Sequence, residues 1–171
     1  MGATDKLLFL AGLTLESHLL LTHWLERKLL FQVILHGRTL EINVFDTDKN
    51  FVLLDFPGYG YAKIPETKRE KLRKMILWYV AEFEHGKRLF MLVIDSNVGL
   101  TDYDKEMIGI FEAENHNYIV IANKADKLNQ SKKAKLMQSL DLEIDSKRYI
   151  LYSATKKQGR DKLLNLISTS L

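Results

Sequence analysis

The stretch YIVIANKAD, residues 118–126, decides the fold class of this chain. Its first five residues are apolar without interruption, which is typical of a strand that is buried on both faces. Two further apolar runs, at residues 89–94 and 149–152, have the same character, and stretches of helical character alternate with these strands. Strands and helices that alternate in this way predict an α/β fold with a mostly parallel sheet and helices on both faces.

The elements before and after these runs complete the predicted domain. Residues 40–45 alternate apolar and polar side chains, and residues 51–54 are wholly apolar, so the polar residues between them predict an antiparallel hairpin. Apolar positions at helical spacing predict helices over residues 66–84, 101–114, 130–140 and 160–171. Because neither an internal repeat nor a linker is visible, the sequence predicts a single domain over residues 1–171.

Composition excludes several classes of protein. The chain has 171 residues, of which 46% are hydrophobic and 27% charged, and these proportions are ordinary for a folded domain. It has no cysteine, so a disulfide framework and a thiolate metal site are excluded. No apolar run approaches the roughly 18 residues that a membrane span needs. No basic start leads into a cleavable apolar core, so we expect no secretory signal. We therefore expect a cytoplasmic protein with no membrane partner.

The tetrapeptide at the end of the 118–122 strand is the most specific of the candidate sites. Ligands of such sheets bind at the carboxyl ends of the strands. The Asp126 carboxylate can accept hydrogen bonds from N1–H and the exocyclic amine of guanine, a donor pair that adenine lacks. The stem of Lys124 can lie along the base, while Asn123 ties neighbouring loops together. The alternative is a polar turn that starts a helix.

The loop DFPGYGYA, residues 55–62, follows the apolar strand at residues 51–54. Asp55 can hold a water bound to Mg²⁺, and Gly58 lets a backbone N–H approach a γ-phosphate. The alternative is a Gly/Pro turn with a capping aspartate. Before the hairpin, the hydroxyl of Thr39 in Gly37-Arg38-Thr39 could ligate Mg²⁺, although this tripeptide has little weight alone.

The loop SATKKQG, residues 153–159, follows the last strand. Its small residues Ser153 and Ala154 would let backbone N–H groups reach the O6 atom of guanine. A helix N-cap is the alternative for this loop.

Taken in this order, the motifs at residues 37–39, 55–62, 123–128 and 153–159 closely resemble the EngB (YihA/YsxC) family of bacterial GTPases, within the TrmE–Era–EngA–EngB–Septin-like group. The resemblance runs from Gly37 to the C-terminus, roughly four-fifths of the chain. It implies a three-layer, P-loop-NTPase-like G domain with a six-stranded sheet and one antiparallel edge hairpin. It also implies a GTP/GDP switch that acts in assembly of the large ribosomal subunit and is linked to cell division and septation.

The resemblance also implies roles for individual residues. Guanine would be bound by Asn123, Lys124, Asp126, Ser153 and Ala154, and the phosphates and switch would involve Gly37, Arg38, Thr39, Asp55 and Gly58. Mg²⁺ would be ligated by Thr39 directly and by Asp55 through water. The residue after Gly58 is Tyr59 rather than the glutamine that orients water in some GTPases, so we expect slow GTP hydrolysis and assign no catalytic residue.

One segment departs from this pattern. A GTPase phosphate loop needs Gly-x-x-x-x-Gly-Lys-[Ser/Thr], but the equivalent stretch AGLTLESHL, residues 11–19, has one glycine, no lysine and an added Glu16. A permitted coding of this stretch, read from the third base of the Leu10 codon, gives Gly-Arg-Ser-Asn-Val-Gly-Lys-Ser-Ser. Our hypothesis is that the segment from about Leu10 to His36 is a frame-shifted reading, restored in frame before Gly37. Codons that forbid the shifted translation would rule it out.

If the segment is real, residues 19–31 predict a helix that is apolar almost all round, and phosphate affinity falls sharply. The alternative function is then a degenerate G domain that binds the ribosome or a protein without nucleotide. The third alternative, an ATP-dependent enzyme, conflicts with the preference of Asp126 for guanine over adenine.

The net charge of +3 is small, so an RNA partner would have to be bound by local clusters of basic residues. There are three such clusters: Lys68, Arg69, Lys71, Arg73 and Lys74; Lys132, Lys133 and Lys135; and Lys156, Lys157, Arg160 and Lys162. We expect the chain to be monomeric.

Overall fold

The computed structural model of the chain describes residues 6–12, 29–34, 41–46, 51–56, 66–82 and 87–171. Contacts divide the chain into two compact units, Met1–Arg88 and Leu89–Leu171. Among the described residues, no helix has both the length and the apolar character needed to cross a membrane. The organisation as a single domain stays a prediction.

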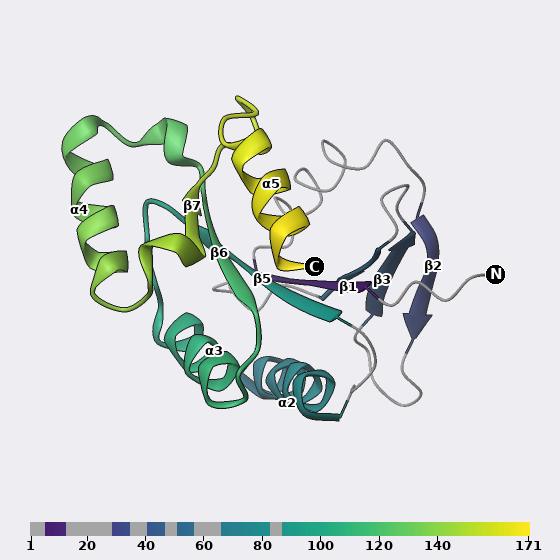
Figure 1. Cartoon of the computed structure of the whole chain (residues 1–171). Coiled ribbons are helices and arrows are strands. Elements are labelled where there is room, and N and C mark those ends of the chain that lie inside the picture. Colours follow the sequence, from purple (N-terminus) through teal and green to yellow (C-terminus); the bar gives the residue numbers. More distant parts are fainter. Residues whose placement is uncertain (1–5, 13–28, 35–40, 47–50, 57–65, 83–86) are drawn as a thin grey trace. The chain divides into compact units, whose positions relative to one another are not determined.

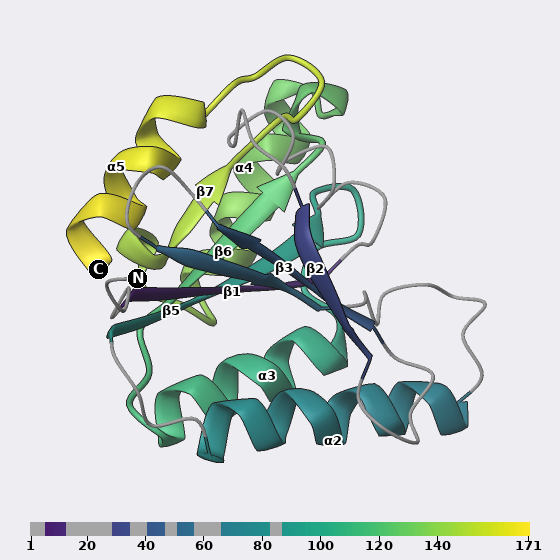
Figure 2. The same ribbon diagram turned by 90° about the vertical axis from the view of Figure 1, so that its right-hand side faces the viewer.

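The first unit contains four strands and one helix. The strands are β1 (Lys6–Gly12), β2 (Leu29–Ile34), β3 (Glu41–Asp46) and β4 (Val52–Asp55), in the spatial order β2-β3-β4-β1. Strands β3 and β4 are antiparallel, which confirms the predicted hairpin, and β4 runs parallel to β1. The helix predicted over residues 66–84 forms as α2 (Glu66–Glu82), which lies along one face of these strands (Figure 2).

Strand β2 corrects the sequence-based expectation. Residues 29–31 were expected at the end of an apolar helix, but Leu29–Ile34 pair antiparallel with β3, from Ile34 beside Glu41 to Leu29 beside Phe45. The β-branched Val33 and Ile34 favour an extended backbone, and β3 offers an unpaired edge on its far side from β4. The described residues therefore hold seven strands, one more than the six predicted. Residues 13–28 lie outside the described part.

Aromatic rings hold α2 against the strands of the first unit. The rings of Phe9 in β1 and Phe56 after β4 stack with their centroids 6.0 Å apart, and the ring of Tyr79 in α2 meets that of Phe56 edge-on at 5.3 Å. Met75 and Ile76 are buried beside them. Burial of such apolar surface stabilises the unit by about 1.5–3 kcal/mol for each large side chain.

The second unit contains three parallel strands, β5 (Lys87–Asp95), β6 (Tyr118–Asn123) and β7 (Tyr149–Leu151). Its helices are α3 (Asp102–Ala113), α4 (Gln130–Asp141) and α5 (Arg160–Ser170), with 3₁₀ turns η1 (Ala125–Lys127) and η2 (Ser146–Arg148). Helices α3 and α5 lie on opposite faces of these strands (Figure 1). Every strand and helix predicted for this unit is confirmed, with ends that shift by no more than two residues.

A capping box fixes the start of α3. The backbone N–H of Thr101 donates to Asp104 Oδ2 at 2.8 Å, and the Thr101 side chain accepts from the backbone N–H of Asp104. Two N–H groups that no helical carbonyl can reach are satisfied in this way. The Phe111 ring in α3 stacks on the Phe90 ring in β5 at 4.8 Å, so the capped helix packs directly on the sheet of its unit.

Leu140 and Leu142, at the end of α4, provide a test of this packing. Leu140 is fully buried, whereas Leu142 is 83% exposed. We expect Leu140→Ala to lower the free energy of unfolding by about 2–4 kcal/mol, because it leaves a cavity in the core. Leu142→Ala, the same change at an exposed position, should lower it by less than about 0.5 kcal/mol. Urea unfolding measures both, and equal losses would contradict the packing described.

Candidate functional site

The carboxyl ends of β5, β6 and β7 meet at one edge of the second unit. The register places Asp95 of β5 beside Asn123 of β6, and Ala122 of β6 beside Leu151 of β7. Each of these strands is followed by a loop, and parallel pairing brings the three loops together. This edge is where ligands bind in sheets of this kind.

Asn123 ties two of these loops together. Its side chain is almost fully buried, and its Oδ1 accepts a hydrogen bond from the backbone N–H of Ala154, 3.1 Å away in the loop after β7. Its backbone carbonyl accepts from the N–H of Ser96, 2.8 Å away in the loop after β5. The predicted role of Asn123 in joining neighbouring loops is confirmed.

Lys124 is held in place by an ion pair. Its φ of 64° lies in the left-handed region, which a non-glycine residue adopts at a cost of order 1 kcal/mol or more. Its Nζ lies 2.7 Å from Asp95 Oδ2, and Asp95 Oδ1 accepts from the backbone N–H and side-chain amide of Asn97 at 2.8 and 3.0 Å. Burial opposes ionisation of Asp95, but the hydrogen bonds from Lys124 and Asn97 outweigh it and lower the pKa of Asp95 below its ordinary value.

Asp126 lies in the short turn η1, which is anchored to the strand ends. The backbone N–H of Ala125 donates to the carbonyl of Tyr152 at 2.9 Å. The Oδ1 atom of Asp126 is enclosed by protein and receives no hydrogen bond from the described residues. Such an enclosed oxygen is an unsatisfied acceptor, which costs about 1–3 kcal/mol. The chemistry of this carboxylate fits a ligand that presents N–H donors, as guanine does.

The loop of residues 153–159 closes tightly on itself. The backbone N–H of Ser153 donates to the carbonyl of Gln158 at 3.1 Å, and Ser153 Oγ accepts from the N–H of Lys156 at 3.0 Å. Gly159 completes the turn with a φ of +86°, and a Cβ at this position would lie 2.7 Å from the carbonyl oxygen of Leu151. Only glycine fits there without displacing the backbone.

This closure changes the role expected for Ser153 and Ala154. The sequence predicted that these small residues would let backbone N–H groups of the loop reach guanine O6. In the structure both N–H groups are already engaged, by Gln158 and by Asn123 respectively. Both residues therefore shape the loop, and in this arrangement they do not present free donors.

Asp55 belongs to the first unit and lies at the end of β4. The register places it between Leu10 of β1 and Asn43 of β3, and it is 5% exposed. The Asn43 amide nitrogen lies 3.5 Å from Asp55 Oδ2. A carboxylate at this position suits a hard cation such as Mg²⁺, although the described residues contain no group of three or more metal-ligating side chains.

The other residues predicted to contact phosphate or metal are Gly37, Arg38, Thr39 and Gly58, and all four lie outside the described residues. The segment equivalent to a phosphate loop falls mostly within residues 13–28, which are outside them as well. The described geometry therefore concerns the part of the site that would hold a base.

Comparison with known proteins places this geometry in a family. The family described as 50S ribosome-binding GTPase matches residues 26–124. The probable GTP-binding protein EngB of Mycoplasmopsis synoviae is 37% identical over 136 residues, which are 78% of this chain and 72% of that protein. The EngB of Aquifex aeolicus is 36% identical over 131 residues, which are 77% of this chain and 72% of that protein. This chain belongs to the EngB family of GTP-binding proteins.

Solved structures show the same fold. The crystal structure of a probable GTP-binding protein EngB matches with a TM-score of 0.75 at 18% identity, over 96% of this chain and 97% of that one. Era from Aquifex aeolicus, bound to GDP and AlF4-, matches with a TM-score of 0.66 at 18% identity, over 97% of this chain and 56% of that one. The predicted three-layer α/β fold of a G domain, with its mostly parallel sheet, is confirmed.

Asp95 is the residue of this EngB-family site that sequence reasoning missed. It holds Lys124 in place but belongs to another strand, 29 residues earlier in the chain. The sequence does indicate Asp95 in one respect, because it places this carboxylate directly after the apolar run of residues 89–94. A charged residue at that position lies at the same sheet edge as Asn123, so it could have been included on topology alone.

The lowered pKa of Asp95 gives a pH-dependent prediction. A carboxylate whose pKa is lower in the folded chain than in the unfolded chain stabilises the folded chain. This stabilisation is fully present when the pH is above the unfolded pKa of about 3.9, and it is lost as the pH falls through the folded pKa. We expect Asp95→Asn to lower the free energy of unfolding by up to about 1 kcal/mol at neutral pH.

The difference in the free energy of unfolding between the wild type and Asp95→Asn should shrink as the pH falls below about 4. Urea unfolding of both proteins from about pH 7 to about pH 3 measures it. Asp161→Asn, at a position whose side chain is 98% exposed, is the control and should show no such dependence. A difference that grows on acidification would contradict the assigned pairing.

Proposed function

We propose that this EngB-family protein is a guanine-nucleotide switch that hydrolyses GTP slowly and acts in assembly of the large ribosomal subunit. The observation that carries the proposal is Asp126, whose enclosed Oδ1 lacks a donor among the described residues while its neighbours are fixed. A carboxylate held in this way is a selector for a base that offers paired donors.

Discrimination between purines follows from the hydrogen-bonding groups of the bases. Guanine presents N1–H and an exocyclic amine on one edge, and a carboxylate accepts from both. Adenine presents an unprotonated N1 and no amine at C2, so the Asp126 carboxylate would face a lone pair instead of a donor. Hydrogen bonds to a charged group contribute about 1.5–3 kcal/mol each.

The neighbours of Asp126 would position the base. The pair of Lys124 with Asp95 fixes the lysine stem, which offers an apolar surface for the flat face of a base. The loop closed by Ser153 and Ala154 would border the O6 side. Thr155, whose N–H makes no hydrogen bond within the described part of the chain, is the next backbone donor available there.

The phosphate half of the proposal rests on the family and on Asp55. Mg²⁺, when bound, would neutralise phosphate charge and polarise the γ-phosphate. Asp55 would hold a metal-bound water, Thr39 would ligate the metal directly, and Gly58 would approach the γ-phosphate. Because Tyr59 follows Gly58, no side chain is assigned to orient the attacking water, and turnover should be slow.

The ribosomal partner is proposed from the family description and from exposed positive charge. On α2, Glu70 Oε1 lies 3.6 Å from Arg73 Nη1 and 4.0 Å from Lys74 Nζ, so this carboxylate neutralises part of the positive charge of the helix. In contrast, Lys156 and Lys157 are exposed in the loop after β7 and have no ion pair among the described residues. We propose a monomer in the cytoplasm that contacts ribosomal RNA, with the link to cell division that the family resemblance implies.

A second candidate function is a nucleotide-free module that binds the ribosome or a protein. The sequence favours it at residues 11–19, which lack the lysine and second glycine of a phosphate loop. Titration of the full chain with fluorescent GDP separates the two functions. Micromolar binding supports the switch, whereas no binding at millimolar GDP supports the module.

Sequencing the encoding DNA across the first forty codons tests the frame-shift hypothesis. Codons that yield the phosphate loop in a shifted frame would support it. The result also tells whether the chain used in any titration carries the printed segment.

Asp126→Asn tests the selection of the base. We expect the affinity for GDP to fall at least about 100-fold, because two charge-assisted hydrogen bonds are lost. The affinity for XDP should rise relative to GDP, since xanthine carries an oxygen acceptor where guanine has the amine and the new amide supplies a donor. Competition titration with GDP, XDP and ADP measures all three. Asp161→Asn is the matched control, and an unchanged purine preference in Asp126→Asn would contradict the proposal.

Salt dependence tests the ribosomal partner. Contacts to RNA phosphates release counterions, so we expect affinity for isolated large subunits to fall at least about tenfold between roughly 50 and 200 mM salt. A Lys156→Gln/Lys157→Gln variant should bind more weakly and with a shallower salt slope. A Lys87→Gln/Lys147→Gln variant removes the same charge elsewhere and serves as the control. Salt-independent cosedimentation would contradict RNA contact.

A further inference from the structure

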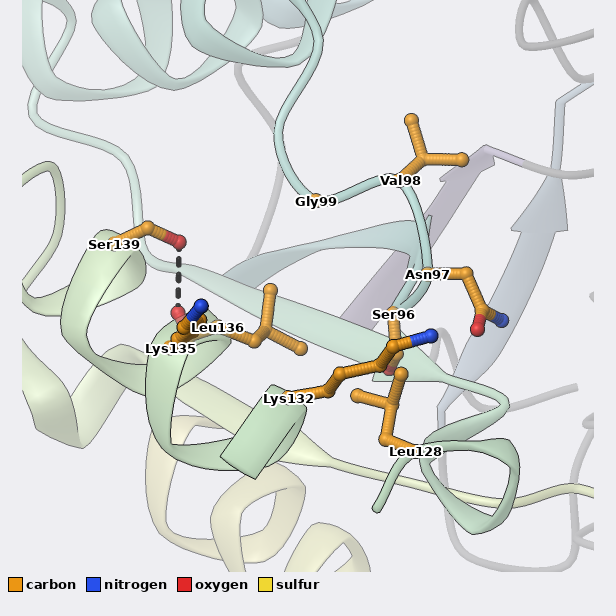
Figure 3. Close-up of a pocket in the computed structure, with 9 residues that line it drawn as sticks. All are labelled: Ser96, Asn97, Val98, Gly99, Leu128, Lys132, Lys135, Leu136 and Ser139. Carbon is orange, nitrogen blue, oxygen red and sulfur yellow. Dashed lines mark hydrogen bonds between the residues drawn. The ribbon is translucent and has the colours of Figure 1, made fainter. Parts of the chain in front are cut away.

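A cavity of about 350 Å³ lies in the second unit between α4 and the loop after β5 (Figure 3). One wall is the loop of residues 96–99, and the other is α4 with the residue Leu128 before it. None of Asn123, Lys124, Asp126, Ser153 and Ala154 lines it. The cavity is therefore separate from the proposed guanine site.

The wall formed by α4 is positively charged. Lys132, Lys135 and Ser139 are three and four residues apart, so they share one face of the helix. No carboxylate lines the cavity, and neither lysine forms an ion pair within the described ranges. Lys132 extends from α4 toward Ser96 and Asn97 (Figure 3). The cavity thus has two ammonium groups and nothing of opposite charge.

Both ends of this wall are anchored. The Asn129 side chain accepts from the backbone N–H of Lys132 at 2.9 Å, which caps the start of α4. The Tyr149 hydroxyl donates to Asp141 at 2.8 Å at the other end of the helix. The lysines therefore project from a helix that is hydrogen-bonded at both ends.

Ser96 on the opposite wall supplies an independent sign of a ligand. It is 4% exposed, and its Oγ is enclosed and has no hydrogen-bond partner among the described residues. Its backbone N–H is used by Asn123, which fixes its position. A buried hydroxyl without a partner is disfavoured unless a ligand or water satisfies it.

The remaining lining defines what else the ligand must carry. Ser139 Oγ donates to the carbonyl of Leu136 at 2.8 Å (dashed in Figure 3), so its proton is already used. Leu128 and Leu136 are largely buried side chains that give the cavity an apolar portion. A volume of about 350 Å³ is at the small end of ligand pockets and well above what one water or simple anion fills.

We propose that this cavity binds a small organic anion, in which a carboxylate or phosphate group is joined to an apolar group about the size of one ring. The anionic group would pair with Lys132 and Lys135. The Ser96 hydroxyl, which is enclosed in the unliganded chain, would rotate about χ1 to donate to the same group. The apolar group would contact Leu128 and Leu136. The proposal does not depend on nucleotide binding by the chain.

Titration of the full chain with four probes tests the proposal, with backbone amide shifts of Ser96, Gly99 and Leu136 followed by NMR. Phenyl phosphate or benzoate should bind at least about tenfold more tightly than benzyl alcohol or inorganic phosphate, because each control probe lacks one of the two required parts. The tighter of the first two tells whether a phosphate ester or a carboxylic acid is preferred. Equal binding of benzyl alcohol, or no binding of either organic anion below about 10 mM, would overturn the proposal.

Variants locate the binding. A Lys132→Gln/Lys135→Gln protein should bind the preferred probe about tenfold more weakly, and Lys133→Gln, on the same helix but outside the cavity lining, should change the affinity less than about twofold. Ser96→Ala should weaken binding about threefold without lowering the urea midpoint of the unliganded chain. Equal weakening by Lys133→Gln, unchanged affinity in Ser96→Ala, or competition by excess GDP would overturn the proposal.

Discussion

The hydrogen bond from the Ala154 N–H to Asn123 Oδ1 joins the loops that follow β6 and β7, and the candidate site depends on it. It forms because parallel pairing puts Ala122 beside Leu151, so both strands end at the same level. The backbone of Asn123 is bonded in turn to Ser96. The side chain and the backbone carbonyl of one buried residue, Asn123, therefore join three loops that are remote in sequence.

Charge around this amide is arranged to keep Lys124 ordered. A lysine at a sheet edge would normally be solvated and mobile, but Asp95 pairs with it and is itself held by Asn97. Partial burial makes this pairing necessary, because an unpaired charge at the same depth would be strongly disfavoured. The apolar stem of Lys124 is therefore held in one position. Asp126, two residues later, has an acceptor, Oδ1, that lacks a donor among the described residues.

The second unit thus contains two enclosed oxygens without hydrogen-bond partners among the described residues, Asp126 Oδ1 in the turn after β6 and Ser96 Oγ directly after β5. Folded proteins rarely leave such groups unsatisfied in their cores. Both oxygens lie near the edge of the sheet at which ligands of such folds bind, and each is a contact that we propose for a ligand. In the first unit, strand β2 pairs with the edge of β3 although its segment is unlike the family.

Sequence alone determined the local structure of the second unit and the chemistry available to the motif that we propose to recognise the base. Apolar periodicity located the helices and strands of the second unit to within two residues, because such patterns record which faces are buried over a few turns or pleats. The residue types in NKAD were enough to predict guanine, since hydrogen-bonding capacity is a property of each side chain. The family resemblance added the expected phosphate and ribosomal roles, which periodicity does not encode.

Tertiary structure decided what depends on register. The pairing of Asp95 with Lys124, the engagement of the Ser153 and Ala154 N–H groups, and the cavity beside Ser96 all require knowledge of which strand ends lie side by side. The strand at Leu29–Ile34 is a similar case, because a short apolar run becomes a strand or a helix according to the partner that it meets. Contacts between residues tens of positions apart have no signature within either local segment, so only the folded chain specifies them.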